Sequence, residues 1–364
     1  MTSDPENLLR VVLGPEIWSR QKTGGISRYF NELANTLTRC NIDIVLMVPK
    51  NYQGLFSHSG INVIKVGGSC DFRKVLKKLR GAGNIYHSTY YDSKNLRYAK
   101  KIGFGTVVSV FDFISEKFPE PKPRFRQIVN EKIKSIELAD RVICISINTE
   151  KDLQEHCQID LGKVSVVPLA SPFSSNTSDF KLLRNRKNFV LYVGKRGGYK
   201  NFQTLLKAFS LTSYFGNQTQ LIAFGGGEFT ANELLEISSL GISSLVLNVQ
   251  GTDSDLCMLY ATAKIFVYPS FYEGFGLPLL EAMSFGCPVL TSNTSSMPEV
   301  CDTAALYFNP DSPIELGELL ESTLSNQSLL NNLSELGFAR SLKFSWEKTT
   351  SLTMNVYKDL QQKI

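Results

Sequence analysis

Two glutamates, Glu273 and Glu281, bracket a Gly-Phe-Gly turn in the stretch SFYEGFGLPLLEAMSFGCPV (270–289). A carboxylate can accept two hydrogen bonds from neighbouring hydroxyls, as acidic residues do with ribose in dinucleotide-binding folds. Gly274 and Gly276 would let backbone N–H groups approach a phosphate, because no side chain stands in the way. The pattern therefore fits a ligand with hydroxyls on both sides of a phosphate. On spacing alone, two solvated acidic residues near a helix N-terminus explain it equally well.

A strand, a loop and a short helix must position these glutamates. KIFVYP (264–269) has the continuous apolar character of a buried strand. Pro278 suits the first turn of a helix, since its missing N–H would be unpaired there, and the helix is predicted over about 278–285. Side chains on a helix lean toward its N-terminus, so Glu281 would reach back over the loop. The next strand is CPVLTS (287–292).

Apolar runs rich in β-branched residues alternate with helical segments in both halves of the chain. In the first half these runs are 10–14, 42–48, 62–66, 84–87, 106–111, 141–146 and 164–168. In the second half they are 189–194, 220–224, 245–249, 264–269, 287–292 and 305–308. The alternation predicts an α/β fold of two doubly wound Rossmann-like domains with parallel sheets. Ligands of such sheets bind at the carboxyl ends of the strands, and the two domains are expected to face each other across a cleft.

The chain of 364 residues is long enough for two domains of ordinary size. A stretch rich in Ser, Asn and Pro predicts a linker over 171–188, between domains over 1–170 and 189–345. No apolar run approaches the length needed to span a bilayer, and MTSDPENLLR lacks the apolar core of a signal peptide. The seven cysteines form no C-x-x-C pair and are expected to be free thiols in the cytoplasm.

Positive charge is concentrated in the first half of the chain. Residues 1–170 carry 25 Lys and Arg against 17 Asp and Glu, whereas residues 171–364 carry 14 against 17. An anionic membrane surface or phosphorylated lipid would suit this half, and so would plain solvation. FRKVLKKLRG (72–81) could rest on lipid as a basic amphipathic helix, but a surface helix with its apolar stripe on the core is favoured. Nucleic acid is not expected, because no nucleic-acid-binding motif occurs.

The stretch EGFGLPLLE resembles the E-x7-E signature of family-4 glycosyltransferases, which are retaining enzymes of the GT-B architecture. Other stretches resemble the family in order along the chain: GGISRYFNELANTL (24–37), ADRVICISINTEKDL (139–153), LYVGKRGGYKNFQTLLKAF (191–209), LYATAKIFVYPSFYEGFGLPLLEAMSFGCPVLTSN (259–293) and FSWEKTT (344–350). This resemblance favours the ligand interpretation of the two glutamates. It also implies an acceptor-side first domain, a nucleotide-sugar-binding second domain, and a helix over 346–364 that packs back on the first domain.

The resemblance implies a nucleotide-diphosphate sugar as co-substrate, with no other cofactor. Glu281 would hold the ribose hydroxyls, and Glu273 the hydroxyls of the transferred sugar. Backbone N–H groups of Phe275, Gly276 and Leu277, beside Gly274, would meet the sugar or the diphosphate.

Fixed cations would stabilise the charge that develops on the diphosphate as the sugar leaves. The resemblance assigns this role to Arg196 and Lys200 in VGKRGGYKN, although Lys195 stands where many relatives carry the arginine. Which of Lys195 and Arg196 faces the diphosphate stays open. Such cations make a metal unnecessary, and no metal site is expected.

In the first domain, Gly24 and Gly25 would approach the donor phosphates. Many relatives carry a His-Asp pair after the strand matching 106–111, but here the pair is Phe111-Asp112. Asp112 is therefore expected to contact a sugar hydroxyl in place of the histidine. His87 either contacts the acceptor or the sugar, or is a satisfied structural histidine, which is the favoured alternative.

The function expected from the resemblance is a retaining, metal-independent hexosyltransferase of surface polysaccharide synthesis, such as that of lipopolysaccharide. It would move mannose from GDP-mannose to a glycan or lipid-diphosphate-linked glycan, at the inner face of the membrane as a peripheral protein. UDP-glucose and UDP-N-acetylglucosamine remain open as donors, and an inactive glycan-binding relative is the alternative from another class. A nicotinamide-dependent oxidoreductase is disfavoured, because FGGGEF and VGKRGGYKN do not fit G-x-G-x-x-G.

Overall fold

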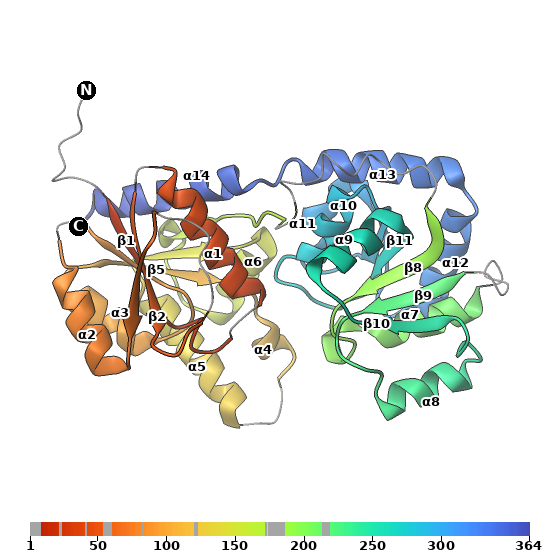
Figure 1. The fold of residues 1–364 in the computed structure, drawn as a ribbon, viewed down its shortest axis with the longest axis horizontal. Coiled ribbons are helices and arrows are strands. Elements are labelled where there is room, and N and C mark those ends of the chain that lie inside the picture. Colours follow the sequence, from red (N-terminus) through yellow and green to blue (C-terminus); the bar gives the residue numbers. More distant parts are fainter. Residues whose placement is uncertain are drawn as a thin grey trace. The chain divides into compact units, whose positions relative to one another are not determined.

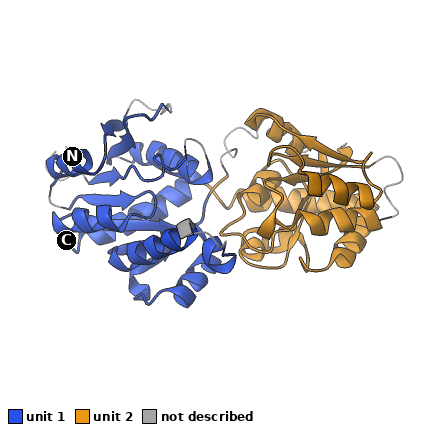
Figure 2. Ribbon diagram, turned by 90° about the horizontal axis from the view of Figure 1, so that it is seen from below, with its two compact units in different colours: residues 1–169, 346–364 blue, residues 170–345 orange. Residues whose placement is uncertain are grey.

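The computed structural model divides the chain into two compact units (Figure 2): Met1–Leu169 with Trp346–Ile364, and Ala170–Ser345. The structure describes residues 9–21, 24–40, 42–53, 60–81, 83–119, 123–171, 173, 186–212 and 219–364. Most of the predicted linker, 171–188, lies outside these described residues.

A parallel sheet forms the centre of the first unit (Figure 1). Among the described residues it has seven strands in the order β3-β2-β1-β4-β5-β6-β7. The strands are β1 (Arg10–Leu13), β2 (Asp43–Pro49), β3 (Asn62–Val66), β4 (Ile85–Ser88), β5 (Gly105–Val110), β6 (Arg141–Cys144) and β7 (Val164–Val166). All six residues of β5 are buried, because helices cover both faces of the sheet.

Helices connect the strands of the first unit, and one of them comes from the far end of the chain. The helices are α1 (Gly25–Thr38), α2 (Ser69–Lys78), α3 (Ser93–Lys101), α4 (Ile114–Lys117), α5 (Pro123–Leu138), α6 (Ile147–His156) and α14 (Trp346–Gln361). In Figure 1, α14 lies beside α1. The hydroxyls of Thr36 and Thr350 are 2.6 Å apart, and the Thr349 hydroxyl donates to the Pro168 carbonyl at 2.8 Å.

Helix α2 contains the basic stretch that could have rested on lipid. Phe72 and Leu76 are buried in the core of the first unit, and Val75 and Leu79 pack against the same cluster. The apolar stripe of α2 therefore faces the core, as the favoured alternative expects. Its basic residues are exposed.

The second unit contains a parallel sheet of its own (Figure 1). Its six strands in the described part of the chain run in the order β10-β9-β8-β11-β12-β13. They are β8 (Lys187–Val193), β9 (Gln220–Phe224), β10 (Val246–Val249), β11 (Ala263–Tyr268), β12 (Val289–Ser292) and β13 (Leu306–Phe308). The helices are α7 (Phe202–Leu211), α8 (Ala231–Ser239), α9 (Asp253–Thr262), α10 (Leu277–Ser284), α11 (Met297–Cys301), α12 (Pro313–Leu324) and α13 (Gln327–Ser341).

Both sheets are doubly wound, so the predicted fold class is confirmed. The strand order reverses between β1 and β4 in the first unit and between β8 and β11 in the second. At such a point the chain leaves neighbouring strands in opposite directions, and a crevice opens at their carboxyl ends. Each unit therefore has one place in its sheet where a ligand is expected.

Helix α10 begins one residue before its predicted start. Gly276 has a φ of 96°, a left-handed conformation that favours glycine, and the helix follows directly from it. Gly286, with a φ of 62°, lies just past the other end and stops the helix. Glu281 is thus the fifth residue of α10, one turn along from the loop.

Candidate functional site

The loops that follow β8, β11 and β13 are hydrogen-bonded to one another next to the reversal point of the second sheet. The Phe271 N–H donates to the Tyr199 carbonyl at 2.8 Å. The Asn201 side-chain amide donates to the carbonyls of Pro269, at 3.0 Å, and Pro310, at 2.8 Å. Asn201 has a φ of 55°, a conformation that Asn adopts more readily than most residues. These bonds fix the turn that carries Lys200.

Lys200 and Glu273 form an ion pair at this point. The Lys200 ammonium nitrogen lies 2.7 Å from Oε1 of Glu273 and 3.2 Å from the Tyr268 hydroxyl. Their side chains are 17% and 9% exposed. Burial, together with the negative charge of Glu273, raises the pKa of Tyr268 well above its ordinary value. The pair is therefore partly shielded from water yet still open to a ligand.

The backbone of Glu273 is held by two serine hydroxyls from the loop after β12. The Ser295 hydroxyl accepts from the Glu273 N–H at 3.1 Å and lies 2.6 Å from the Glu273 carbonyl, to which it donates. The Ser296 hydroxyl donates to the same carbonyl at 2.9 Å. These serines are missing from the predicted site, because a pair of serines in a sequence does not indicate which distant residue it contacts.

Glu281 receives a hydrogen bond from a buried tyrosine. The Tyr260 hydroxyl on α9 donates to Oε2 of Glu281 at 3.0 Å. Burial and the neighbouring carboxylate raise the pKa of Tyr260 well above its ordinary value, so the hydroxyl keeps its proton. Glu281 itself is 8% exposed. The tyrosine thus orients a carboxylate that sits near the loop of Gly274 and Gly276.

Arg196, which the sequence assigns to a diphosphate, is buried and bonded within the protein. Its guanidinium donates to Oε1 of Glu233 at 2.8 Å. It also donates to the carbonyls of Gly225 at 2.7 Å, Gly227 at 3.0 Å and Glu228 at 2.7 Å. The side chain is 3% exposed. In this structure the guanidinium therefore holds the loop after β9, and its contact with a diphosphate stays a prediction.

The glycines of that loop make the arrangement around Arg196 possible. Gly226 has a φ of 75°, and a Cβ atom there would lie 2.7 Å from the Gly194 carbonyl oxygen. Close approach of the two loops therefore requires glycine at position 226. The neighbouring Lys195 side chain is exposed, unlike that of Arg196. Of these two basic residues, Lys195 is the one open to a ligand.

His87 is a buried residue of the first unit's core. Its Nδ1 lies 2.6 Å from the Tyr357 hydroxyl, and its Nε2 lies 2.9 Å from the Ser109 hydroxyl. Burial lowers the pKa of His87 to about 3, so the ring is neutral. With both nitrogens engaged and no exposed surface, His87 fits the structural alternative that the sequence favoured.

Asp112 is half-buried at the carboxyl end of β5. Its Oδ1 accepts from the Ile114 N–H at 3.1 Å, and its carbonyl accepts from the Lys132 ammonium at 2.9 Å. Lys132 also pairs with Glu116 at 2.8 Å, and these two side chains are 2% and 4% exposed. The preceding Phe111 packs among aromatic rings. Asp112 therefore stands on a turn that these hydrogen bonds hold in place.

Gly24 and Gly25 mark the start of α1. Gly24 is extended, with a φ of 171°, and Gly25 is the first residue of the helix. A Cβ atom on Gly25 would meet nothing within 4 Å, so open space adjoins it. Their contact with donor phosphates remains an expectation.

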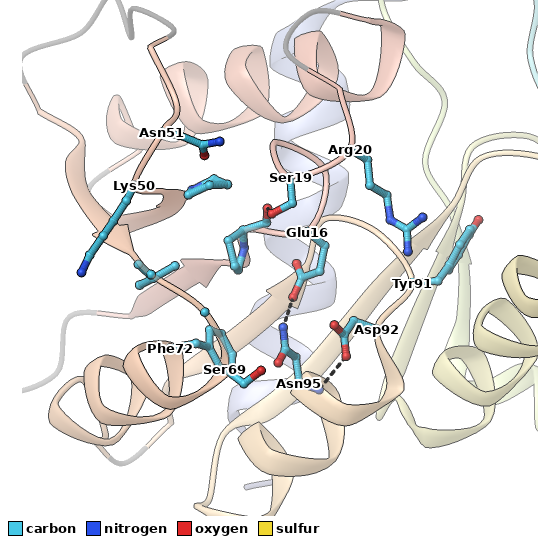
Figure 3. Close-up of a pocket in the computed structure, with 15 residues that line it drawn as sticks. Glu16, Ser19, Arg20, Lys50, Asn51, Ser69, Phe72, Tyr91, Asp92 and Asn95 are labelled. Atoms are coloured by element: carbon cyan, nitrogen blue, oxygen red, sulfur yellow. Dashed lines mark hydrogen bonds between the residues drawn. The ribbon is translucent and has the colours of Figure 1, made fainter. Parts of the chain in front are cut away.

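A cavity of about 530 Å³ opens at the reversal point of the first sheet (Figure 3). Glu16 lies at its base, where it accepts from the Asn95 amide at 2.9 Å and from the Tyr86 hydroxyl. Burial raises the pKa of Glu16. Residues that line the cavity and that Figure 3 labels include Ser19, Arg20, Lys50, Asn51, Tyr91 and Asp92. No motif in the sequence indicates this cavity, because loops after several strands of the sheet form it.

No group of three His, Cys, Asp or Glu residues that could hold a metal occurs in the described part of the chain. Asp253 and Asp255 stand two positions apart in the first turn of α9, where Asp255 closes a capping box with Thr252.

Among the described residues, no helix is both long and apolar enough to cross a membrane.

Two doubly wound units with parallel sheets define the GT-B class of fold, and solved structures share it over nearly the whole chain. Sucrose-phosphate synthase from Thermosynechococcus elongatus superposes with a TM-score of 0.76 at 18% identity, covering 98% of this chain and 100% of that one. WaaG, a glycosyltransferase involved in lipopolysaccharide biosynthesis, does so with a TM-score of 0.71 at 18% identity, covering 97% and 99%.

Residues 174–340 match the family described as glycosyl transferases group 1, so the chain carries a domain of that family. O-antigen chain mannosyltransferase B from Escherichia coli is 36% identical over 175 residues, which are 47% of this chain and 46% of the relative. A serotype-specific mannosyltransferase, WbdA, from the same species is 30% identical over 254 residues, or 66% and 31% of the two chains. The matches thus span less than half the length of these relatives. The resemblance to glycosyltransferases is confirmed.

Proposed function

We propose that the chain is a retaining glycosyltransferase that moves mannose from GDP-mannose onto a growing surface glycan. The observation that carries this proposal is the ion pair of Lys200 and Glu273 at the reversal point of a glycosyl transferases group 1 domain, with Glu281 on the helix that follows the same loop. The preference for mannose rests on the mannosyltransferases among the relatives. UDP-glucose and UDP-N-acetylglucosamine are the alternative donors.

In this proposal the second unit binds the donor. Glu281, oriented by Tyr260, accepts from the ribose hydroxyls, and Glu273 accepts from the hydroxyls of the sugar. Backbone N–H groups of the Phe275–Leu277 segment meet the diphosphate or the sugar. Lys195 and Lys200 provide the positive charge at the diphosphate, since both keep exposed surface while Arg196 does not.

The first unit binds the acceptor in its cavity. Carboxylate, amide and hydroxyl groups beside an aromatic ring suit the hydroxyls and the apolar face of a sugar, and these groups line the cavity (Figure 3). Arg20 and Lys50 add positive charge that suits a glycan carried on a lipid diphosphate. The basic surface of this unit, including the exposed residues of α2, fits peripheral binding to an anionic membrane.

The proposed reaction proceeds on one face of the sugar and retains its configuration. The bond between the anomeric carbon and the phosphate oxygen breaks, the acceptor oxygen bonds to that carbon, and the acceptor's proton passes to the departing phosphate. Lys195 and Lys200 stabilise the phosphate charge as it develops, which a metal would otherwise do. Asp112 orients a sugar hydroxyl, because Phe111 stands where many relatives carry a histidine.

A donor screen tests the proposal. Thermal shifts with GDP, UDP and NAD identify the nucleotide, and labelled GDP-mannose, UDP-glucose and UDP-N-acetylglucosamine identify the sugar. We expect stabilisation by GDP, and transfer from GDP-mannose with the α configuration kept in the product by NMR. Glycan binding without any sugar transfer would instead support the inactive glycan-binding relative.

A further inference from the structure

Ser295 has a backbone conformation that serine rarely adopts. Its φ is 56°, in the left-handed region where most side chains are disfavoured. Glycine is the residue that usually occupies such a position at low cost. A serine that persists there is held by its surroundings, and such residues often occur at functional sites. Its hydroxyl contacts show what holds it.

The Ser295 hydroxyl bonds to both polar groups of the Glu273 main chain. It accepts from the N–H at 3.1 Å and donates to the carbonyl at 2.6 Å. Ser296, fully buried, donates to that same carbonyl at 2.9 Å. Two side chains from the loop after β12 thus form hydrogen bonds with the backbone N–H and carbonyl of one residue in the loop after β11.

This contact acts on the residue that precedes the two glycines of the loop. Gly274 follows Glu273 directly, and Gly276 adopts a φ of 96° two residues later. Glycines give a loop many accessible conformations, so its path needs an anchor. Once the Glu273 backbone is fixed, its side chain can meet Lys200 at 2.7 Å, and little freedom is left to the carboxylate.

We propose that Ser295 and Ser296 are positioning residues that fix the Glu273 carboxylate for the transferred sugar. The inference rests on the proposed function, which assigns the sugar hydroxyls to Glu273. Displacement of a group by about 1 Å can slow an enzymatic step by about a hundredfold. The serines therefore act on the rate of transfer through Glu273, with no contact to the substrate required.

Two substitutions of Ser295 separate the effect of losing its hydroxyl from the effect of its strained backbone conformation. Ser295→Gly removes the hydroxyl and accepts the left-handed conformation, whereas Ser295→Ala removes the hydroxyl and keeps the strain. Ser296→Ala removes the second donor. The exposed Ser322 on α12, whose hydroxyl bonds within its own helix, supplies the matched control Ser322→Ala.

We expect Ser295→Gly to melt close to the wild type and above Ser295→Ala. Both variants, and Ser296→Ala, should nevertheless lower kcat about tenfold with GDP-mannose, while the binding of GDP weakens by less than about twofold. GDP lacks the sugar that Glu273 would hold, so a general loss of folding would affect both quantities and a positioning role only the first. The control should match the wild type in both.

Wild-type kcat and KM in the Ser295→Gly, Ser296→Ala double variant would overturn the inference. Hydrogen exchange of the Glu273 amide supplies a measurement that requires no activity. It should become faster in the double variant, and an unchanged rate also overturns the inference. A wild-type chain that transfers no sugar and binds no nucleotide refutes the proposed function, and with it the role of the serines in transfer. The exchange rate still shows whether they hold the loop.

Discussion

The Lys200 ammonium nitrogen lies 2.7 Å from the Glu273 carboxylate, so two groups assigned to different parts of the donor are paired with each other. Each neutralises the other's charge before a ligand arrives. A diphosphate that binds Lys200 must therefore compete with Glu273. Such a pair, partly shielded from water, contributes roughly 1 kcal/mol.

Glu273→Gln should bind GDP more tightly and transfer sugar more slowly. Loss of the carboxylate charge frees Lys200 for the diphosphate, which predicts about fivefold tighter GDP binding from roughly 1 kcal/mol of pairing. Transfer should slow about a hundredfold, because an amide has one acceptor oxygen and no negative charge with which to hold the sugar hydroxyls. Calorimetric titration with GDP and single-turnover transfer measure the two effects. Weaker GDP binding would contradict the competition, and Glu318→Gln on the exposed face of α12 is the control.

Glu281→Ala should weaken GDP and GDP-mannose equally. A charged hydrogen-bond acceptor for ribose contributes about 1.5–3 kcal/mol, so affinity for both should fall about ten- to a hundredfold. Tyr260→Phe, which removes the hydroxyl that orients Glu281, should cause a loss of a few-fold in the same direction. Titration of both ligands against each variant measures the effects. An unchanged affinity in Glu281→Ala would refute the ribose contact.

Arg196 and Lys195 should respond differently to replacement by alanine. Arg196→Ala removes a charged donor from Oε1 of Glu233 and from the carbonyls of the loop after β9, and should lower the free energy of unfolding by about 3–5 kcal/mol. Lys195→Ala should change it by less than about 0.5 kcal/mol yet slow transfer about a hundredfold. Urea unfolding and initial rates measure the two variants. A stable but inactive Arg196→Ala would restore Arg196 as the diphosphate ligand.

The buried His87 should make the first unit sensitive to acid. Its folded pKa of about 3 lies below the unfolded value of roughly 6.5. As the pH falls below 6.5, the unfolded chain binds a proton that the folded chain does not, so stability falls as the pH falls. The loss is about 1.4 kcal/mol one pH unit below the unfolded pKa and grows down to about pH 3.

Urea unfolding at pH 7.5 and at pH 5.5 measures this sensitivity. His87→Gln should be less stable than the wild type at pH 7.5, because Tyr357 and Ser109 lose their partner, but should lose less stability on acidification. His156→Gln, at an exposed position of α6, should keep the wild-type response. Equal losses in all three proteins would refute the assignment.

The strands and the glutamate helix could be predicted because their signals are local. Strands buried on both faces need continuous apolar runs, as 189–194 shows, and such runs are visible in the sequence. Helix α10 is delimited by Pro278 and Gly286, which act within a turn of their own position. The spacing of Glu273 and Glu281 fits a ligand site and solvated acidic residues equally well, and only the family resemblance favours a nucleotide sugar as their ligand.

The remainder depends on partners far along the chain. Arg196 is buried because Glu233 and the glycine carbonyls after β9 surround it, and a basic segment read alone does not show this. Ser295 contacts Glu273, 22 positions away, from a left-handed conformation that its residue type does not indicate. The cavity around Glu16 is assembled from the loops of several strands. Each of these features is created by tertiary packing.

The placement of α14 determines the order in which the two units can be completed during synthesis. Residues 346–364 belong to the first unit, where Tyr357 bonds to His87 and Thr350 contacts Thr36. Domains commonly fold in the order in which they leave the ribosome. Here the unit that begins first must wait for residues translated after the whole of Ala170–Ser345. A nascent chain therefore carries an open first unit, with the core around His87 uncovered, until its partner unit is fully made.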